Sequence, residues 1–175
     1  MIGALLLAVL SFGAQDGLPR GRVVERVVCR ADASQSYALY LPSGYTPERR
    51  WPILYCFDPV ARGRYPVERF RAAAERFGWI VVGSNVSRNG LVERSMAAGA
   101  AMWADTHERF AVDDGRVYTA GFSGGARIAT WSALSCDGCI AGVVACGAAF
   151  PNGVRPGDPR LKEPVRFAYF MTAGV

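Results

Sequence analysis

The chain has 175 residues, enough for one domain with a core of its own. Hydrophobic residues make up 51% of it and charged residues 20%, which is typical of a globular protein and excludes a disordered one. The net charge of +5 comes almost entirely from arginines, which are scattered along the chain and do not form the basic stripe of a nucleic-acid-binding protein. We therefore expect no nucleic-acid partner.

The first fourteen residues have the pattern of a secretory signal peptide. An apolar run at 2–10 is followed by mostly small residues up to Ala14, which is the order found before a signal cleavage site. The run lacks the usual basic start, so a short anchor or a mis-assigned start codon is the alternative, but it is too short to span a bilayer. We expect a secreted or periplasmic protein whose domain is 15–175, with no stable membrane insertion after cleavage.

Strand and helix patterns alternate through the rest of the chain. Strands are predicted at 22–30, 35–41, 51–57, 79–83, 116–120, 140–146 and 165–172, and helices at 67–77, 91–110 and 126–134. The strand at 51–57 is almost continuously apolar, as in a parallel sheet covered on both faces. The pattern predicts a three-layer α/β fold, mostly parallel, with antiparallel strands at the N-terminus.

One pentapeptide carries the strongest functional signal. Gly121-Phe122-Ser123-Gly124-Gly125 lies between a predicted strand and a predicted helix, the context in which G-x-S-x-G forms a nucleophile elbow. Such a turn exposes the serine hydroxyl, and the N–H of Gly124 at the helix N-terminus favours an oxyanion. With 20 glycines in the chain the bare pattern also arises by chance, but its position between strand and helix favours function.

The five cysteines cannot all pair within the chain. Cys136 and Cys139 form a C-x-x-C at the end of a predicted helix, whereas a redox-active pair needs its first cysteine at a helix start. A zinc site needs two more ligands, and no second pair is present. We expect a local disulfide or two structural thiols, with a thiol-redox protein as a remote alternative.

Three segments together resemble one family. They are YLPSGY at 40–45, WPILY at 51–55 and RVYTAGFSGG at 116–125, and in this order they resemble the α/β-hydrolase superfamily, most closely secreted esterases of the poly(hydroxybutyrate) depolymerase and feruloyl esterase type. The resemblance implies hydrolysis of a small-molecule or polymer ester through an acyl-enzyme on Ser123, with no metal or organic cofactor. A peptidase-type hydrolase on the same fold is the alternative.

The resemblance also implies a second oxyanion donor in the loop after the strand at 51–57. The family's His-Gly pair is absent there, and Pro59 has no N–H, so Val60 or Ala61 is the candidate. Arg62 is a candidate for holding a substrate carboxylate, or it pairs with Asp58.

Asn85 and Arg88 follow the strand at 79–83, and ligands of such sheets bind beyond the carboxyl ends of the strands. The two residues are therefore candidates for lining the pocket, although polar residues that merely form a turn have the same pattern.

The departure from the family is the rest of the triad. In this superfamily the acid and the histidine follow the serine, but the only histidine, His107, precedes it and is expected at the surface. Asp158 is a candidate acid or a solvated loop residue. We therefore expect the N-terminal part of the fold, without the final strands and helix, and weak or absent activity. A non-catalytic degenerate fragment is the second alternative.

Overall fold

The computed structural model describes residues 17–148, 150 and 167–173. Its seven strands form one sheet in the order β1-β2-β4-β3-β5-β6-β7. The strands are β1 (Val23–Val28), β2 (Ser36–Tyr40), β3 (Trp51–Phe57), β4 (Ile80–Ser84), β5 (Val112–Phe122), β6 (Gly142–Cys146) and β7 (Ala168–Thr172). β2 runs antiparallel to both β1 and β4, and the strands from β4 to β7 run parallel to one another. The predicted mixed sheet with antiparallel N-terminal strands is confirmed.

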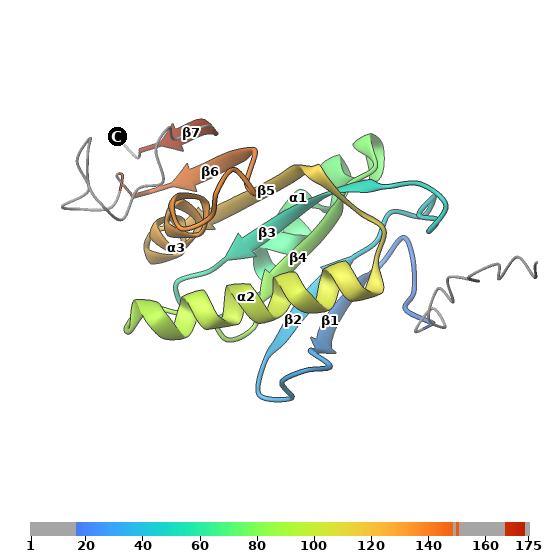
Figure 1. Ribbon diagram of the computed structural model, residues 1–175, viewed down its shortest axis with the longest axis horizontal. Helices are drawn as coiled ribbons and strands as arrows, with labels where there is room; N and C mark the ends of the chain where they lie inside the picture. The colour runs from blue at the N-terminus through green and yellow to red at the C-terminus, as the bar shows by residue number, and fades with distance from the viewer. Residues whose placement is uncertain (1–16, 149, 151–166, 174–175) are drawn as a thin grey trace, which may run out of the picture.

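In the part of the chain that the structure describes, three helices cover the two faces of this sheet (Figure 1). They are α1 (Arg64–Phe77), α2 (Val92–Arg109) and α3 (Gly124–Leu134). The step from β3 to β4 moves one way along the sheet, and the steps from β4 to β5 and from β5 to β6 move the other way. Because parallel crossovers are right-handed, α1 lies on one face and α2 and α3 lie on the opposite face, giving three layers.

The strands explain why a core forms on both sides. All seven residues of β3 are buried. Ile53, Tyr55 and Phe57 belong to the hydrophobic cluster that includes Met102 of α2, while Leu54 and Cys56 belong to the cluster that includes Val67 of α1. Successive side chains of a strand point to opposite faces, so the continuous apolar run serves both layers.

Most element boundaries shift by one or two residues from the prediction, and the starts of α1 and β5 shift further. α1 begins at Arg64, three residues before the predicted start, because Pro66 is tolerated in the first turn of a helix. β5 begins at Val112 and takes in residues 113–115, predicted as a turn. Five residue steps along β5, from Val112 to Val117, match two along β3, so the turn is a wide bulge inside the strand.

Two predictions lie outside the residues that the structure describes: the signal peptide at 1–14 and the candidate acid Asp158. Within the described ranges, no helix has both the length and the apolar character needed to cross a membrane.

Candidate active site

Ser123 lies at the sharp turn between β5 and α3. Its backbone has φ 53° and ψ −121°, and only one other non-glycine residue among those described, Ala61, has a positive φ. The N–H of Ser123 donates a hydrogen bond of 2.8 Å to the carbonyl of Cys146, which anchors the turn to β6. The residue is half-buried at the carboxyl end of β5, outside the regular helix.

The flanking glycines allow this turn because the backbones pass very close. A Cβ on Gly121 would lie 2.2 Å from the carbonyl oxygen of Gly125, and a Cβ on Gly125 would lie 2.1 Å from that of Phe57. Both distances are far inside van der Waals contact. The two outer glycines of G-x-S-x-G therefore let the first turn of α3 rest directly on β5 and β3.

Gly124 is the first residue of α3, so its N–H has no acceptor within the helix and lies at the positive end of the helix dipole. A Cβ on Gly124 would lie 1.8 Å from Oδ1 of Asn89, which places the Asn89 side chain against the elbow. Asn89 was not singled out by sequence reasoning. It belongs to a polar run after β4 in which several residues have equal claims, and no local signal distinguishes it.

The loop after β3 uses its N–H groups internally. The N–H of Val60 donates to Oδ1 of Asp58 at 2.9 Å, and the N–H of Ala61 donates to the carbonyl of Asp58 at 3.3 Å. In this conformation neither predicted second donor is free to receive an oxyanion. The loop is tied to the segment after β4, because the N–H of Asn89 donates to the carbonyl of Pro59 at 2.8 Å.

Arg62 pairs with Asp58, one of its two predicted roles. Its Nε and Nη2 lie 3.1 Å and 3.0 Å from the two carboxylate oxygens. Asp58 is 3% exposed; burial raises the pKa of its carboxyl, but the hydrogen bonds from Arg62 and Val60 outweigh this effect and the net pKa is lowered. This two-pronged pair joins the buried Asp58 carboxylate to the exposed Arg62 side chain and fixes the loop.

Asn85 and Arg88 make their contacts with residues outside the elbow. The Asn85 amide donates to the carbonyl of Glu25 in β1 at 3.0 Å, away from α3. Arg88 is exposed, forms an isolated antiparallel bridge with Val60 and donates its backbone N–H to Ser95 at 3.2 Å. Their contacts are those of loop residues, and their role as pocket residues stays a prediction.

A cavity of about 300 Å³ opens beside the elbow on the α1 side of the sheet. It is lined mainly by apolar and aromatic side chains together with the Asp58–Arg62 pair, among them Phe57, Tyr65, Phe70 and Phe122. The guanidinium of Arg62 lies 5.0 Å from the centre of the Tyr65 ring. A mostly apolar pocket with a few fixed polar groups is the usual form of a small-molecule site.

His107 lies at the other end of β5. Its Nδ1 is 2.8 Å from the carbonyl of Trp103, and its Nε2 is 3.2 Å from Oδ1 of Asp114. The regular part of β5 from Val117 to Ser123 spans about 20 Å at the usual rise per residue. The single imidazole of this chain therefore does not reach Ser123.

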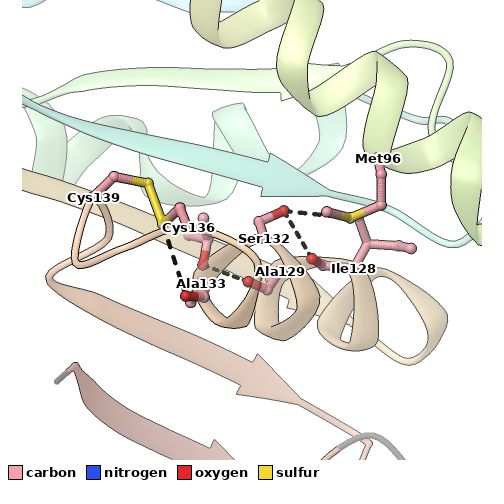
Figure 2. Close-up of a disulfide and its surroundings, with 8 residues drawn as sticks. Met96, Ile128, Ala129, Ser132, Ala133, Cys136 and Cys139 are labelled. Carbon is pink, nitrogen blue, oxygen red and sulfur yellow. Dashed lines mark hydrogen bonds between the residues drawn. A yellow bond between two sulfur atoms is a disulfide. The ribbon is translucent and has the colours of Figure 1, made fainter. Parts of the chain in front are cut away.

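The C-x-x-C is a disulfide. Cys136 and Cys139 are bonded, with their Cα atoms 5.7 Å apart, in the turn that follows α3 (Figure 2). Ser132, one turn earlier on α3, donates to the carbonyl of Ile128 at 2.9 Å and lies 3.9 Å from the sulfur of Met96 on α2. Of the two predicted states of the pair, the structure has the local disulfide.

The other cysteines, Cys29, Cys56 and Cys146, are free thiols. Burial, together with the charge of Asp105, raises the pKa of Cys29 to about 11, and burial raises that of Cys56 as well. Raised pKa values make these two thiols poor nucleophiles. Among the residues that the structure describes, no group of three or more His, Cys, Asp or Glu side chains is arranged to hold a metal ion.

The strand order, the two-sided helix cover and the strained serine between β5 and α3 define an α/β-hydrolase fold. No family model and no curated protein sequence matches the chain. Solved structures do match it, among them two esterases and a poly(3-hydroxybutyrate) depolymerase.

The chain is similar to an esterase from Pyrobaculum calidifontis, with 19% identity and a TM-score of 0.55 over 73% of this chain and 45% of that one. It is similar to an acetyl xylan esterase from Aspergillus awamori, with 16% identity and a TM-score of 0.57 over 71% of this chain and 51% of that one. It is also similar to LpqC, a poly(3-hydroxybutyrate) depolymerase from Bordetella parapertussis, with 18% identity and a TM-score of 0.54 over 71% and 50%. The chain thus spans about half the length of these structures, and at such identities the likeness establishes the fold alone.

Proposed function

We propose that Ser123 is the nucleophile of a serine esterase that forms an acyl-enzyme with carboxylic esters. The observation that carries the proposal is the backbone of Ser123, which is held in a rarely populated conformation at the N-terminus of α3. Strain of this kind persists only where the surrounding structure enforces it, and it gathers at functional sites. The second strained residue, Ala61, lies in the loop that faces the same end of the sheet.

The proposed chemistry begins with transfer of the Ser123 Oγ proton to a base while Oγ bonds to the ester carbonyl carbon. The carbonyl oxygen becomes an oxyanion, which the N–H of Gly124 and the dipole of α3 stabilise. Collapse of this intermediate breaks the bond to the alcohol, which leaves with the proton. Water then attacks the acyl-enzyme and releases the carboxylic acid and Ser123.

The base of this reaction is not His107, because β5 separates it from Ser123. We propose that the imidazole comes from outside these 175 residues. Without it Ser123 remains a neutral hydroxyl, which is a weak nucleophile.

Esters are the proposed substrates because two of the similar structures named above are esterases and the third is a poly(3-hydroxybutyrate) depolymerase. The polarity of the cavity suits a small ester or one repeat of a polyester. Export to an oxidising compartment remains part of the proposal and is supported by the Cys136–Cys139 disulfide, since such bonds persist mainly outside the cytosol.

The test uses the natural protein that carries this chain. A fluorophosphonate probe is expected to label the wild type and not Ser123→Ala, and p-nitrophenyl acetate hydrolysis is expected to disappear in the same variant. Labelling at another residue, or hydrolysis that survives in Ser123→Ala, would refute the assignment. A p-nitroanilide of an aminoacyl group, assayed beside the ester, separates an esterase from a peptidase.

A non-catalytic role is the second candidate, favoured by one observation: the single histidine pairs with Asp114 at the far end of β5. For this candidate we expect no labelling of Ser123 in the natural protein. The same probe experiment therefore decides between the two.

A further inference from the structure

The elbow supplies one oxyanion donor, and the two N–H groups predicted to supply the second, those of Val60 and Ala61, are already engaged. The N–H groups of Val60 and Ala61 both donate to Asp58, and that carboxylate is further held by Arg62 through two hydrogen bonds. Freeing either N–H requires the buried carboxylate of Asp58, or its carbonyl, to lose a partner. Loss of a partner by a buried polar group is costly.

Another polar group already lies against the elbow. If Gly124 carried a Cβ, that atom would meet Oδ1 of Asn89 at 1.8 Å and Nδ2 at 3.6 Å, so the amide is packed on the α-carbon of Gly124. No hydrogen bond between described residues involves the Asn89 side chain. Its two N–H donors are therefore not used by the described part of the protein.

The position of Asn89 is fixed through its backbone. Its N–H donates to the carbonyl of Pro59 at 2.8 Å, and the preceding residue, Arg88, bridges to Val60 and donates its own N–H to Ser95 of α2. The segment after β4 is thus joined to the loop after β3 and to α2. The exposed side chain of Asn89 is therefore carried on a backbone that is held in place on two sides.

We propose that the side-chain amide of Asn89 is the second oxyanion donor of this site, acting with the backbone N–H of Gly124. The inference rests on the proposed esterase function of Ser123. The two groups meet the same developing charge from the β4 side and from the N-terminus of α3. The glycine at position 124 then has a specific reason: any side chain there displaces the amide.

The first experiment compares variants of the natural protein in p-nitrophenyl acetate hydrolysis. Asn89→Ala is expected to lower kcat by about 100-fold, as for loss of one oxyanion donor, with KM nearly unchanged because the oxyanion exists only beyond the ground state. Asn89→Asp, which keeps the shape but replaces the donors by a negative charge, is expected to lose at least as much. Glu93→Gln is the matched control and is expected to keep wild-type kcat, because Glu93 is an exposed residue on the first turn of α2.

The second experiment tests the contact itself. Gly124→Ala keeps the backbone N–H but pushes the amide away, so it is expected to lower kcat in the wild type. In the Asn89→Ala background the same change is expected to add little, because the group that it displaces is already gone. Such non-additivity is the sign of two residues acting through one interaction.

Each outcome is decisive. The proposal stands if Asn89→Ala lowers kcat, leaves KM and thermal unfolding unchanged, and is non-additive with Gly124→Ala. It falls if hydrolysis depends on Ser123 but Asn89→Ala stays within about threefold of the wild type, well short of the loss of a donor, or if the effects of Asn89→Ala and Gly124→Ala simply add. If hydrolysis does not depend on Ser123 at all, the esterase function itself fails, and the role of Asn89 fails with it.

Discussion

The backbone conformation that exposes the Ser123 hydroxyl is strained and disfavours the folded state. A non-glycine residue at φ 53° and ψ −121° costs about 1–3 kcal/mol, which the surrounding contacts must offset. The bond from its N–H to Cys146 and the packing of α3 on β5 and β3 supply those contacts. Stability is thus given up at the residue that the proposed chemistry needs.

This strain predicts an unusual order of stability. Ser123→Gly and Ser123→Ala both remove the hydroxyl, but only glycine relieves the conformation. We expect Ser123→Gly to be more stable than Ser123→Ala by about 1 kcal/mol, the relief being partly offset by the greater freedom of glycine in the unfolded chain. Urea unfolding of the two variants measures the difference, and equal midpoints would show that the turn carries no strain.

The lowered pKa of Asp58 predicts how the free energy of unfolding changes with pH. This pKa is lowered in the folded state because hydrogen bonds from Arg62 and Val60 outweigh burial. The contribution of the carboxylate to the free energy of unfolding is therefore complete above the unfolded pKa of about 3.9 and is lost as the pH falls through the folded pKa. We expect Asp58→Asn to cost about 2 kcal/mol at neutral pH, the worth of hydrogen bonds to a charged group.

The check on Asp58 is the difference between the wild type and Asp58→Asn in urea unfolding as the pH is lowered. The difference should be constant at and above neutral pH and shrink below about pH 4. A difference that persists undiminished in acid would mean that the carboxylate charge contributes nothing.

At the residue scale the sequence predicted the sharp turn at Ser123 and Gly124, because the elbow is local: five consecutive residues between a strand and a helix. The catalytic roles of the two residues stay predictions. The pairing of Arg62 with Asp58 was also within reach, since the two are four residues apart. The engagement of Val60 and Ala61 was not, because it depends on how the Asp58 carboxylate turns back on its own loop. Asn89 was missed because its contact joins segments 35 residues apart in the sequence.

At the scale of the elements, the first turn of α3 can pack on β3 only because Gly125 has no side chain. A Cβ on Gly125 would lie 2.1 Å from the backbone oxygen of Phe57, and backbone cannot turn aside as a side chain can. We expect Gly125→Ala to destabilise the protein by about 3 kcal/mol or more. Gly44→Ala is the matched control, because nothing lies within 4 Å of its Cβ and its effect should stay within about 0.5 kcal/mol. Thermal or urea unfolding of both variants tests this.

The disulfide stabilises the turn from α3 into β6 and closes only a four-residue loop. The chain-entropy relation gives roughly 2 kcal/mol for so short a loop. We expect the double variant Cys136→Ser/Cys139→Ser to lose about that amount under oxidising conditions.

In reductant the free energy of unfolding of the wild type should fall by the same amount and equal that of the double variant. Thiol titration of the unfolded, unreduced wild type should find the three free cysteines, Cys29, Cys56 and Cys146. Five reactive thiols in protein from an oxidising compartment would contradict the disulfide.

The elements themselves were largely predictable, since their apolar periodicity is a local property and their existence and order agree with the structure. The early start of α1 has a local cause, the tolerance of Pro66 in a first helical turn, whereas the error in β5 has a tertiary cause. The bulge in β5 is stabilised by pairing of Val112 and Val117 with β3, which the turn-forming residues between them do not reveal. The place of the C-x-x-C after a helix disfavoured a redox site but left a local disulfide and two structural thiols open, and the structure has the disulfide.

At the scale of the whole molecule the two faces of the sheet are covered unequally. Leu54, Tyr118 and Val144 of the central strands line, with Phe77 of α1, a cavity of about 560 Å³ on the α1 face. It adjoins the cavity beside the elbow, since Phe70 and Val144 line both. A crossover to any strand added beyond β7 in the same direction would fall on the opposite face, so such a crossover would leave this groove open.

An open apolar groove across parallel strands predicts self-association of the 175-residue chain, because patches of this kind are normally covered. Phe77 is 66% exposed at its rim. We expect Phe77→Lys to weaken association about tenfold or more, given the 1.5–3 kcal/mol gained by burying a phenylalanine. Its stability should change little, since the side chain is mostly in solvent.

Leu91→Lys is the control, because Leu91 is 76% exposed but precedes α2 on the other face. Sedimentation velocity over a range of concentrations compares the three proteins: equal association by both variants would place the contact elsewhere, and a monomeric wild type would show that the groove is too small to hold a second copy.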